Sequence, residues 1–166
     1  MYIPSFRDHR KRVFLPVNPC LMQISLFLFL LFAGIRATTP DPSPQFRTIK
    51  LSEFTRGTMR IIEVTPKQYT VILNARTERG IIEPAVWKRI VEEARKLPLY
   101  HLEDVPVPSK RHQVDAALSA SLTFIMRDTS VFTPTFDHNN PPEVYQPLID
   151  LLYQQVPLSM KDDFKR

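Results

Sequence analysis

The sequence predicts a single α+β domain, in which a mostly antiparallel sheet of about five strands carries two helices on one face. Three observations carry this prediction: short segments alternate apolar and polar residues, two longer segments show helical spacing, and the turns between strands are too short for parallel crossovers. With 166 residues, 43% of them hydrophobic, the chain is long enough to build one hydrophobic core.

Three strands are expected at the start of the domain. Residues 46–54 alternate apolar with polar side chains, Gly57 interrupts the pattern, and residues 59–64 resume it. After the turn Thr65-Pro66-Lys67, residues 69–74 are rich in β-branched and aromatic side chains, which favour strands. These segments predict a β-meander.

A helix follows the meander and a hairpin follows the helix. Pro84 suits the first turn of a helix, and the apolar residues after it recur at helical spacing until Pro98 ends the element. Residues 98–113 are expected to form a loop, and residues 118–126 alternate as a strand with one buried face. Residues 131–136 are its expected partner, and Pro134 makes that partner an edge strand or a bulged one.

The last expected element is a helix with a broad apolar stripe. Asn140 is predicted as its N-cap, with Pro141 at the first helical position and Glu143 three residues after the cap. The domain is expected to span residues 46–158, and residues 159–166 are expected to be a charged, frayed tail.

Residues 1–37 have the features of a secretory signal peptide. Arg10-Lys11-Arg12 precede an apolar run at 21–35, and Ala37 is suited to cleavage. The run is shorter than the roughly 20 residues that span a bilayer. A retained membrane anchor stays open as an alternative, and so does a translation start at Met22. The sequence therefore predicts an exported protein, located in the periplasm, in the cell envelope or outside the cell.

The basic net charge belongs to this leader. The chain has 22 Lys and Arg against 17 Asp and Glu, a formal charge of +5, and the first 37 residues contribute +4 of it. Residues 38–45 are rich in proline and are expected to form an extended linker to the domain. Because the domain has no clustered basic run and the chain has only three glycines, neither a nucleic acid nor a nucleotide is expected as a partner. Cys20, in the leader, is the single cysteine, which excludes disulfides and thiol chemistry from the exported part.

The segment 136–142 has a dense group of polar side chains followed directly by two prolines, which restrict the backbone. We expect it to be chiefly a cap and turn between the last strand and the last helix, and we expect recognition to be its functional content. The predicted binding residues come from this segment and from the loop before it: Ser109, Lys110, Arg111, Asp115, Asp137, His138 and Asn139.

An enzyme is the competing hypothesis. A hydrolase or a metal-dependent enzyme would use His138 together with the 101–115 loop, which contains further potential ligands: His101, Glu103, Asp104, His112 and Asp115. Asp137 and His138 are adjacent, so in a strand they point to opposite faces and cannot serve one catalytic constellation. Metal-site spacings such as HExxH are also missing from the sequence. We therefore predict a non-enzymatic protein with no cofactor and no metal.

The order of elements resembles that of the emfourin family of small bacterial protease inhibitors. The similarity rests on a helix ending in Lys96-Leu97-Pro98-Leu99, a loop, a hairpin, and a closing helix over residues 142–152. The segments 108–111 with 115–117, and 136–142, look like those of a group of uncharacterised small exported bacterial proteins. The resemblance implies a binding module that acts on another protein, either a protease or an envelope component. A membrane-anchored structural protein of the envelope is the third hypothesis, and in it the membrane is met only through an uncleaved leader.

Overall fold

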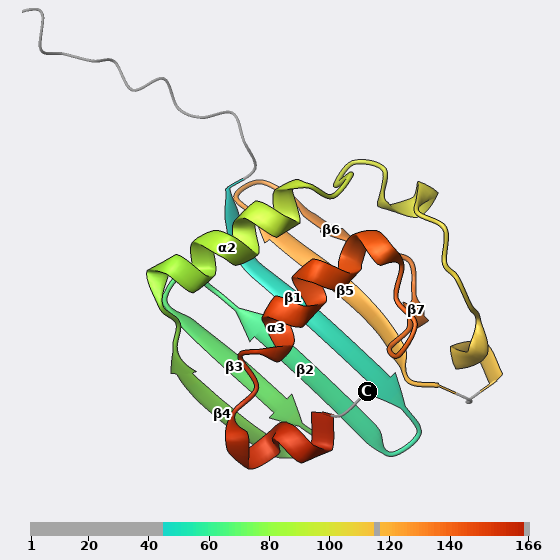
Figure 1. Ribbon diagram of the computed structural model, residues 1–166, viewed down its shortest axis with the longest axis horizontal. Coiled ribbons are helices and arrows are strands. Elements are labelled where there is room, and N and C mark those ends of the chain that lie inside the picture. Colours follow the sequence, from blue (N-terminus) through green and yellow to red (C-terminus); the bar gives the residue numbers. More distant parts are fainter. Residues whose placement is uncertain (1–44, 115–116, 165–166) are drawn as a thin grey trace, which may run out of the picture. The chain divides into compact units, whose positions relative to one another are not determined.

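The structure, a computed structural model, describes residues 45–114 and 117–164. These residues build one compact unit in which a seven-stranded sheet carries two α-helices on one face (Figure 1). The predicted α+β class, with a mostly antiparallel sheet, is confirmed. The predicted signal peptide (1–37), all but the last residue of the linker (38–45) and Asp115 lie outside the described residues.

All paired strands are antiparallel, in the order β4-β3-β2-β1-β5. Because β1 occupies one side of β5, the last two strands both pair with its other side, one after the other. The strand bounds are β1 Phe46–Thr55, β2 Thr58–Val64, β3 Gln68–Leu73, β4 Arg76–Ile81, β5 Ser119–Met126, β6 Ser130–Phe132 and β7 Phe136–Asp137.

The alternating pattern correctly identified the strands that build the core. In the register of β1 with β5, Ile49 lies opposite Phe124 and Leu51 opposite Leu122, and all four side chains are at most 1% exposed. Their polar neighbours point to the other face of the sheet, as the two-residue period requires. The central strands are therefore held by the burial of alternate side chains under the helices.

The expected number of strands is too low for two reasons: the predicted strand 131–136 is divided into β6 and β7, with Pro134 between them, and β4 was not predicted. Its sequence, Arg-Thr-Glu-Arg-Gly-Ile, is charged, contains a glycine and shows little strand propensity. It pairs with β3 across a tight turn in which Asn74 adopts a left-handed conformation (φ 51°), which asparagine tolerates better than most residues. The Asn74 side chain also accepts a hydrogen bond from the backbone N–H of Met59 at 2.8 Å, which ties the turn to β2.

The first helix, α2 (Pro84–Arg95), begins at the predicted proline. Ile90 and Ala94 are fully buried against the sheet, and the helix ends before Pro98, as expected. Two short 3₁₀ turns, η1 (Leu102–Asp104) and η2 (Arg111–Val114), lie in the loop that follows. In the described part of the chain, no helix is long and apolar enough to cross a membrane.

The predicted start of the last helix is wrong. The backbone N–H of Asn140 donates to the carbonyl of Asp137 at 3.0 Å, so Asn140 belongs to the turn after β7 and is not a helix cap. A 3₁₀ turn, η3 (Glu143–Tyr145), comes next, and α3 covers Gln146–Tyr153. Pro147 falls in the first turn of α3, the part of a helix that tolerates proline.

The expectation of a frayed tail is also wrong for the residues that the structure describes. The segment after α3 forms η4 (Leu158–Phe164), in which Met160 is 0% and Phe164 is 3% exposed. The ring of Phe164 packs edge-on against Tyr153 of α3, with the ring centroids 6.2 Å apart. These apolar contacts hold the segment against the domain, although its charged residues had predicted a frayed tail.

Candidate functional site

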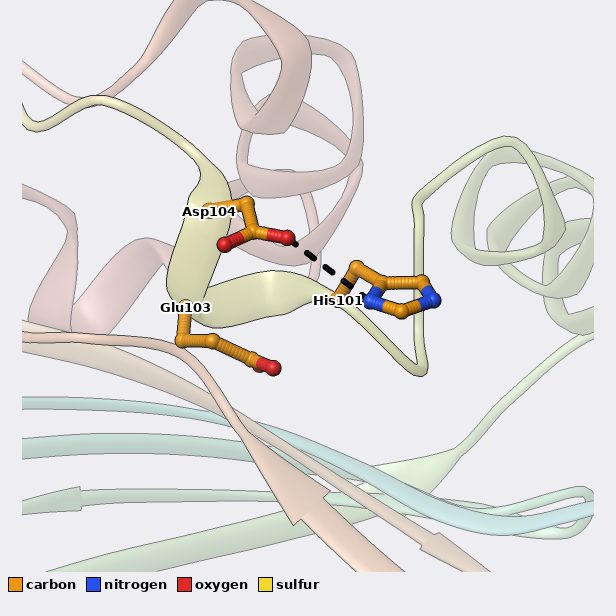
Figure 2. A group of neighbouring side chains, drawn as sticks. All are labelled: His101, Glu103 and Asp104. Atoms are coloured by element: carbon orange, nitrogen blue, oxygen red, sulfur yellow. Dashed lines mark ion pairs between the residues drawn. The ribbon is translucent and has the colours of Figure 1, made fainter.

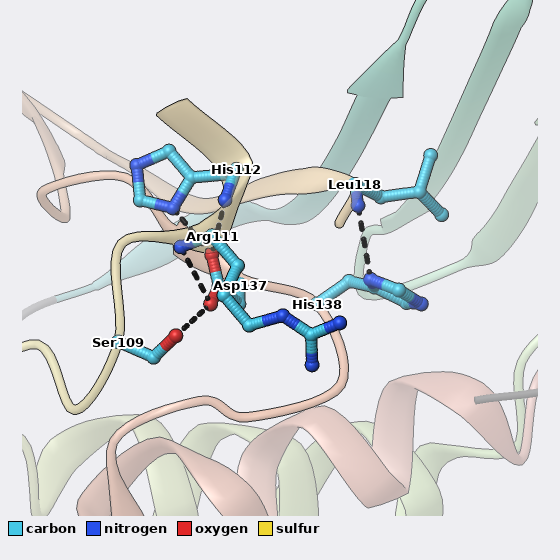
Figure 3. A network of polar contacts seen from close by, with 6 residues as sticks. All are labelled: Ser109, Arg111, His112, Leu118, Asp137 and His138. Atoms are coloured by element: carbon cyan, nitrogen blue, oxygen red, sulfur yellow. Dashed lines mark hydrogen bonds and ion pairs between the residues drawn. The ribbon is translucent and has the colours of Figure 1, made fainter. Parts of the chain in front are cut away.

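A buried carboxylate organises the polar residues around β7. The side chain of Asp137 is fully buried and accepts hydrogen bonds from a loop that precedes it by 25 to 28 residues (Figure 3). Its donors are the Ser109 hydroxyl, the backbone N–H of Arg111 at 3.1 Å, the backbone N–H of His112 at 2.8 Å and His112 Nδ1 at 2.5 Å. We call these residues (Ser109, Arg111, His112 and Asp137) the Asp137 clamp.

The hydrogen bonds keep Asp137 ionised. Burial by itself raises the pKa of the carboxyl, but the hydrogen bonds from Ser109, from the backbone and ring of His112 and from the backbone of Arg111 outweigh it and lower the pKa to about 2. A carboxylate that accepts several N–H and O–H donors is stabilised in its charged form. Asp137 therefore acts as a fixed negative charge and a multiple acceptor.

The clamp also completes a helix end. The first N–H groups of a helix have no partner within it, and in η2 those of Arg111 and His112 donate to Asp137. An acidic side chain favours this position, because the peptide dipoles make the start of a helix electropositive. In this way Asp137, at the end of β7, fixes the position of the 109–112 loop.

His138 turns away from the clamp, as the alternation of side chains along a strand predicts. Its backbone N–H donates to the carbonyl of Leu118 at 3.1 Å, and its Nδ1 accepts the N–H of Leu118 at 3.2 Å (Figure 3). Nδ1 is thus an acceptor, which places the proton of the neutral ring on Nε2. His138 and Asp137 serve two different contacts, and His138 reinforces the pairing of β7 with the start of β5.

The clamp brings a serine, a histidine and an aspartate together, but not in the order that activates a nucleophile. The Ser109 hydroxyl donates to Asp137, and His112 Nδ1 contacts the same carboxylate. In nucleophilic catalysis the histidine stands between the serine and the acid, so that it can remove the hydroxyl proton. Here Asp137 stands between the serine and the histidine, so the arrangement connects the 109–112 loop to β7.

The predicted binding residues differ in burial and in what they contact. Asp137 is buried and Ser109 is half-buried in the clamp, whereas Lys110, Arg111 and Asn139 have exposed positions. His138 is half-buried against Leu118, and Asp115 lies outside the described residues. His112 was predicted only as a residue of the competing hydrolase or metal-dependent enzyme, because no local pattern signals a pairing with a residue 25 positions away.

A second polar group lies on η1. His101, Glu103 and Asp104 each place one potential metal-ligating atom within 4.8 Å of the others, and His101 Nδ1 lies 3.7 Å from Asp104 Oδ2 (Figure 2). All three side chains come from one exposed turn, and an ion pair of this kind needs no metal. We therefore assign the group no coordination role.

Comparison with family models, with curated protein sequences and with solved structures found no match to this chain. The similarity to emfourin-type inhibitors accordingly stays a prediction from the order of elements. Function has to be argued from the site, since one fold serves many functions.

Proposed function

We propose that this chain is an exported, non-enzymatic binding module that contacts a partner protein through Lys110 and Arg111. The observation that supports the proposal is the Asp137 clamp, which holds the residues on both sides of Lys110. The clamp uses the buried polar groups for positioning and leaves the two cationic positions exposed.

A held loop is suited to binding. Ser109 and Arg111 are both tied to one carboxylate, and Pro106 and Pro108 restrict the backbone that leads to them. The ordering cost of the loop is therefore met during folding, and less conformational entropy is lost when a partner binds. Protease inhibitors rely on the same principle, which agrees with the role that the family resemblance implies.

The charge of the loop indicates the kind of partner. Lys110 and Arg111 are adjacent and exposed, so an acidic surface of a protease or an envelope component is complementary to them. Contacts between exposed charges weaken as salt screens them, with a Debye length of about 8 Å at 0.15 M. Binding through this loop is expected to decrease with rising ionic strength.

The test is affinity capture from an envelope extract with the full chain. We expect a protein to be retained by the unaltered chain and lost with the double variant Lys110→Ala/Arg111→Ala. The matched control is Lys67→Ala/Arg127→Ala, which removes the same charge from two other exposed positions. Retention by this control shows that loop position matters rather than net charge.

Two results would contradict the proposal. One is capture of the same proteins by the Lys110→Ala/Arg111→Ala variant, and the other is the absence of any salt-sensitive partner together with no effect on the activity of co-exported proteases. N-terminal sequencing of the exported form tests the cleavage after Ala37 on which the location depends.

A further inference from the structure

A second surface, which shares no residue with the Asp137 clamp, lies at the outer edge of β6. A cavity of about 410 Å³ opens there between the loop after α2 and the edge strand. Its apolar lining consists of Leu99, Tyr100, Leu102, Val131, Phe132 and Pro134, which we call the edge groove. Tyr100 is 72% and Phe132 is 74% exposed, an unusual exposure for two large rings beside one cavity.

The backbone of β6 offers hydrogen-bonding groups to this groove. Thr129 and Thr133 direct their groups to β5, because the N–H of Met126 donates to Thr129 O at 2.8 Å and that of Thr133 to Leu122 O at 3.0 Å. Direction alternates along an antiparallel strand, so the N–H and C=O groups of Ser130 and Phe132 point away from β5. Within the described residues no backbone group pairs with them.

The opposite edge of the sheet is protected in a way that β6 is not. Arg76 and Glu78 of β4 form an ion pair at 2.8 Å, and Arg76 also donates to the carbonyl of Ser159 at 3.2 Å. Charged side chains and covering segments are the usual means by which an edge strand avoids pairing with another chain. The Ser-Val-Phe sequence of β6 has no charge.

The charge at the groove is negative. Glu103 lines the cavity, and Asp104 follows it on the same exposed turn, with no basic residue among the lining side chains. A carboxylate at the rim of an apolar groove is complementary to a lysine or arginine flanked by apolar residues. This preference is opposite to that of the Lys110 and Arg111 loop.

We propose that the edge groove binds an extended segment of another protein, which adds to β6 as a further strand. The outward backbone groups of Ser130 and Phe132 would form the ladder, and apolar side chains of the segment would enter the groove. A lysine or arginine of the segment would meet Glu103. In strand addition the main-chain bonds supply affinity and the pockets for alternate side chains supply specificity. The surface is separate from the one in the proposed function and stands without it.

The experiment uses the full chain and an acetylated seven-residue peptide of alternating valine and lysine. We expect backbone amide signals of Ser130 and Phe132 to shift in NMR titration. Two altered peptides separate the contributions: N-methylation of the backbone removes the ladder donors, and glutamate in place of lysine reverses the charge. Each is expected to bind at least about 10-fold more weakly, the effect of losing roughly 1.4 kcal/mol.

Protein variants locate the site. Ser130→Pro removes one outward N–H without touching the bonds to β5, and Phe132→Ala removes an exposed ring; both are expected to weaken binding about 10-fold or more. Ile81→Ala, at an 86% exposed position on β4, is the matched control and is expected to have no effect. Unchanged spectra with the valine and lysine peptide, equal binding of the N-methylated peptide, or signal shifts on β4 instead of β6 would each overturn the proposal.

Discussion

Two carboxylates are buried among the residues that the structure describes, and they are held in different ways. Asp137, at the end of β7, is 0% exposed and accepts hydrogen bonds from two backbone N–H groups and two side chains of one loop. Glu53, in β1, is 2% exposed; it accepts a hydrogen bond from the hydroxyl of Tyr153 at 2.5 Å and forms an ion pair with Arg60 of the neighbouring strand, whose Nη1 lies at 3.7 Å.

The difference lies in what each carboxylate fixes. Glu53 and Arg60 face each other in the register of β1 and β2, and the guanidinium of Arg60 stacks on Phe164 with its centre 5.5 Å from the ring centroid. That cluster joins the C-terminal segment to a sheet that alternate burial already defines. Asp137 instead holds residues 109–112, a segment that has no apolar side chain of its own to bury. Glu53 thus connects side chains of elements that are already packed together, whereas Asp137 also holds main-chain N–H groups of a loop.

Removal of the Asp137 side chain is expected to have the largest effect. Asp137→Ala removes a fully buried carboxylate and leaves the N–H groups of Arg111 and His112 without their acceptor, so the free energy of unfolding should fall by about 3 to 5 kcal/mol. Urea unfolding at neutral pH measures the loss. Asp163→Ala, at an exposed position in η4, is the control and should change stability by less than about 0.5 kcal/mol. A loss below about 1 kcal/mol for Asp137→Ala would contradict the role assigned to the clamp.

For Glu53 the expected loss is smaller and can be reversed. Glu53→Leu leaves the charge of Arg60 largely buried and should cost about 2 to 3 kcal/mol, while Glu53→Leu/Arg60→Met should recover most of it, since apolar replacement of a buried ion pair is often neutral. Urea unfolding of the two variants gives the difference. If Glu53→Leu/Arg60→Met is no more stable than Glu53→Leu, the expectation is wrong, and Glu53 contributes more than neutralisation of the Arg60 charge.

Acid is expected to release the clamp selectively. The pKa of Asp137 is lowered from 3.8 to about 2 in the folded protein, so the folded state holds the proton less tightly than the unfolded chain. The stabilisation is complete above about pH 4 and is lost as the pH falls toward 2. Unfolding of the unaltered chain and of Asp137→Asn, compared across this range, isolates the contribution because the other carboxyls are common to both. Parallel pH profiles would count against it.

The smallest effect is expected from the Ser109 hydroxyl. Ser109→Ala removes one donor while the backbone donors to Asp137 remain, so the loss should be about 1 kcal/mol and the pKa of Asp137 should rise. Chemical denaturation and an NMR titration of the carboxyl carbon report the two quantities. Ser130→Ala, on the exposed edge strand, provides a serine control. A pKa that stays at about 2 in Ser109→Ala would show that the main-chain donors alone maintain the charge.

The elements that were predicted correctly are those in which each residue's environment follows from its neighbours in sequence. β5 is such a case, because alternate residues from Leu118 to Met126 are buried. β4 was missed because its charged sequence becomes a strand only when β3 offers a partner. The last helix was placed too early, since the turn that uses Asn140 depends on the carbonyl of Asp137.

The sequence by itself determined the α+β class, the antiparallel arrangement and the strands of the central sheet. These follow from local periodicity and from turns that are short along the chain. Only the tertiary structure decided that Asp137 meets Ser109 and His112, that His138 faces Leu118, and that β6 carries an open edge beside a groove. The hydrogen bonds among them join residues 20 or more positions apart, and a hydrogen bond between distant residues leaves no period in the sequence.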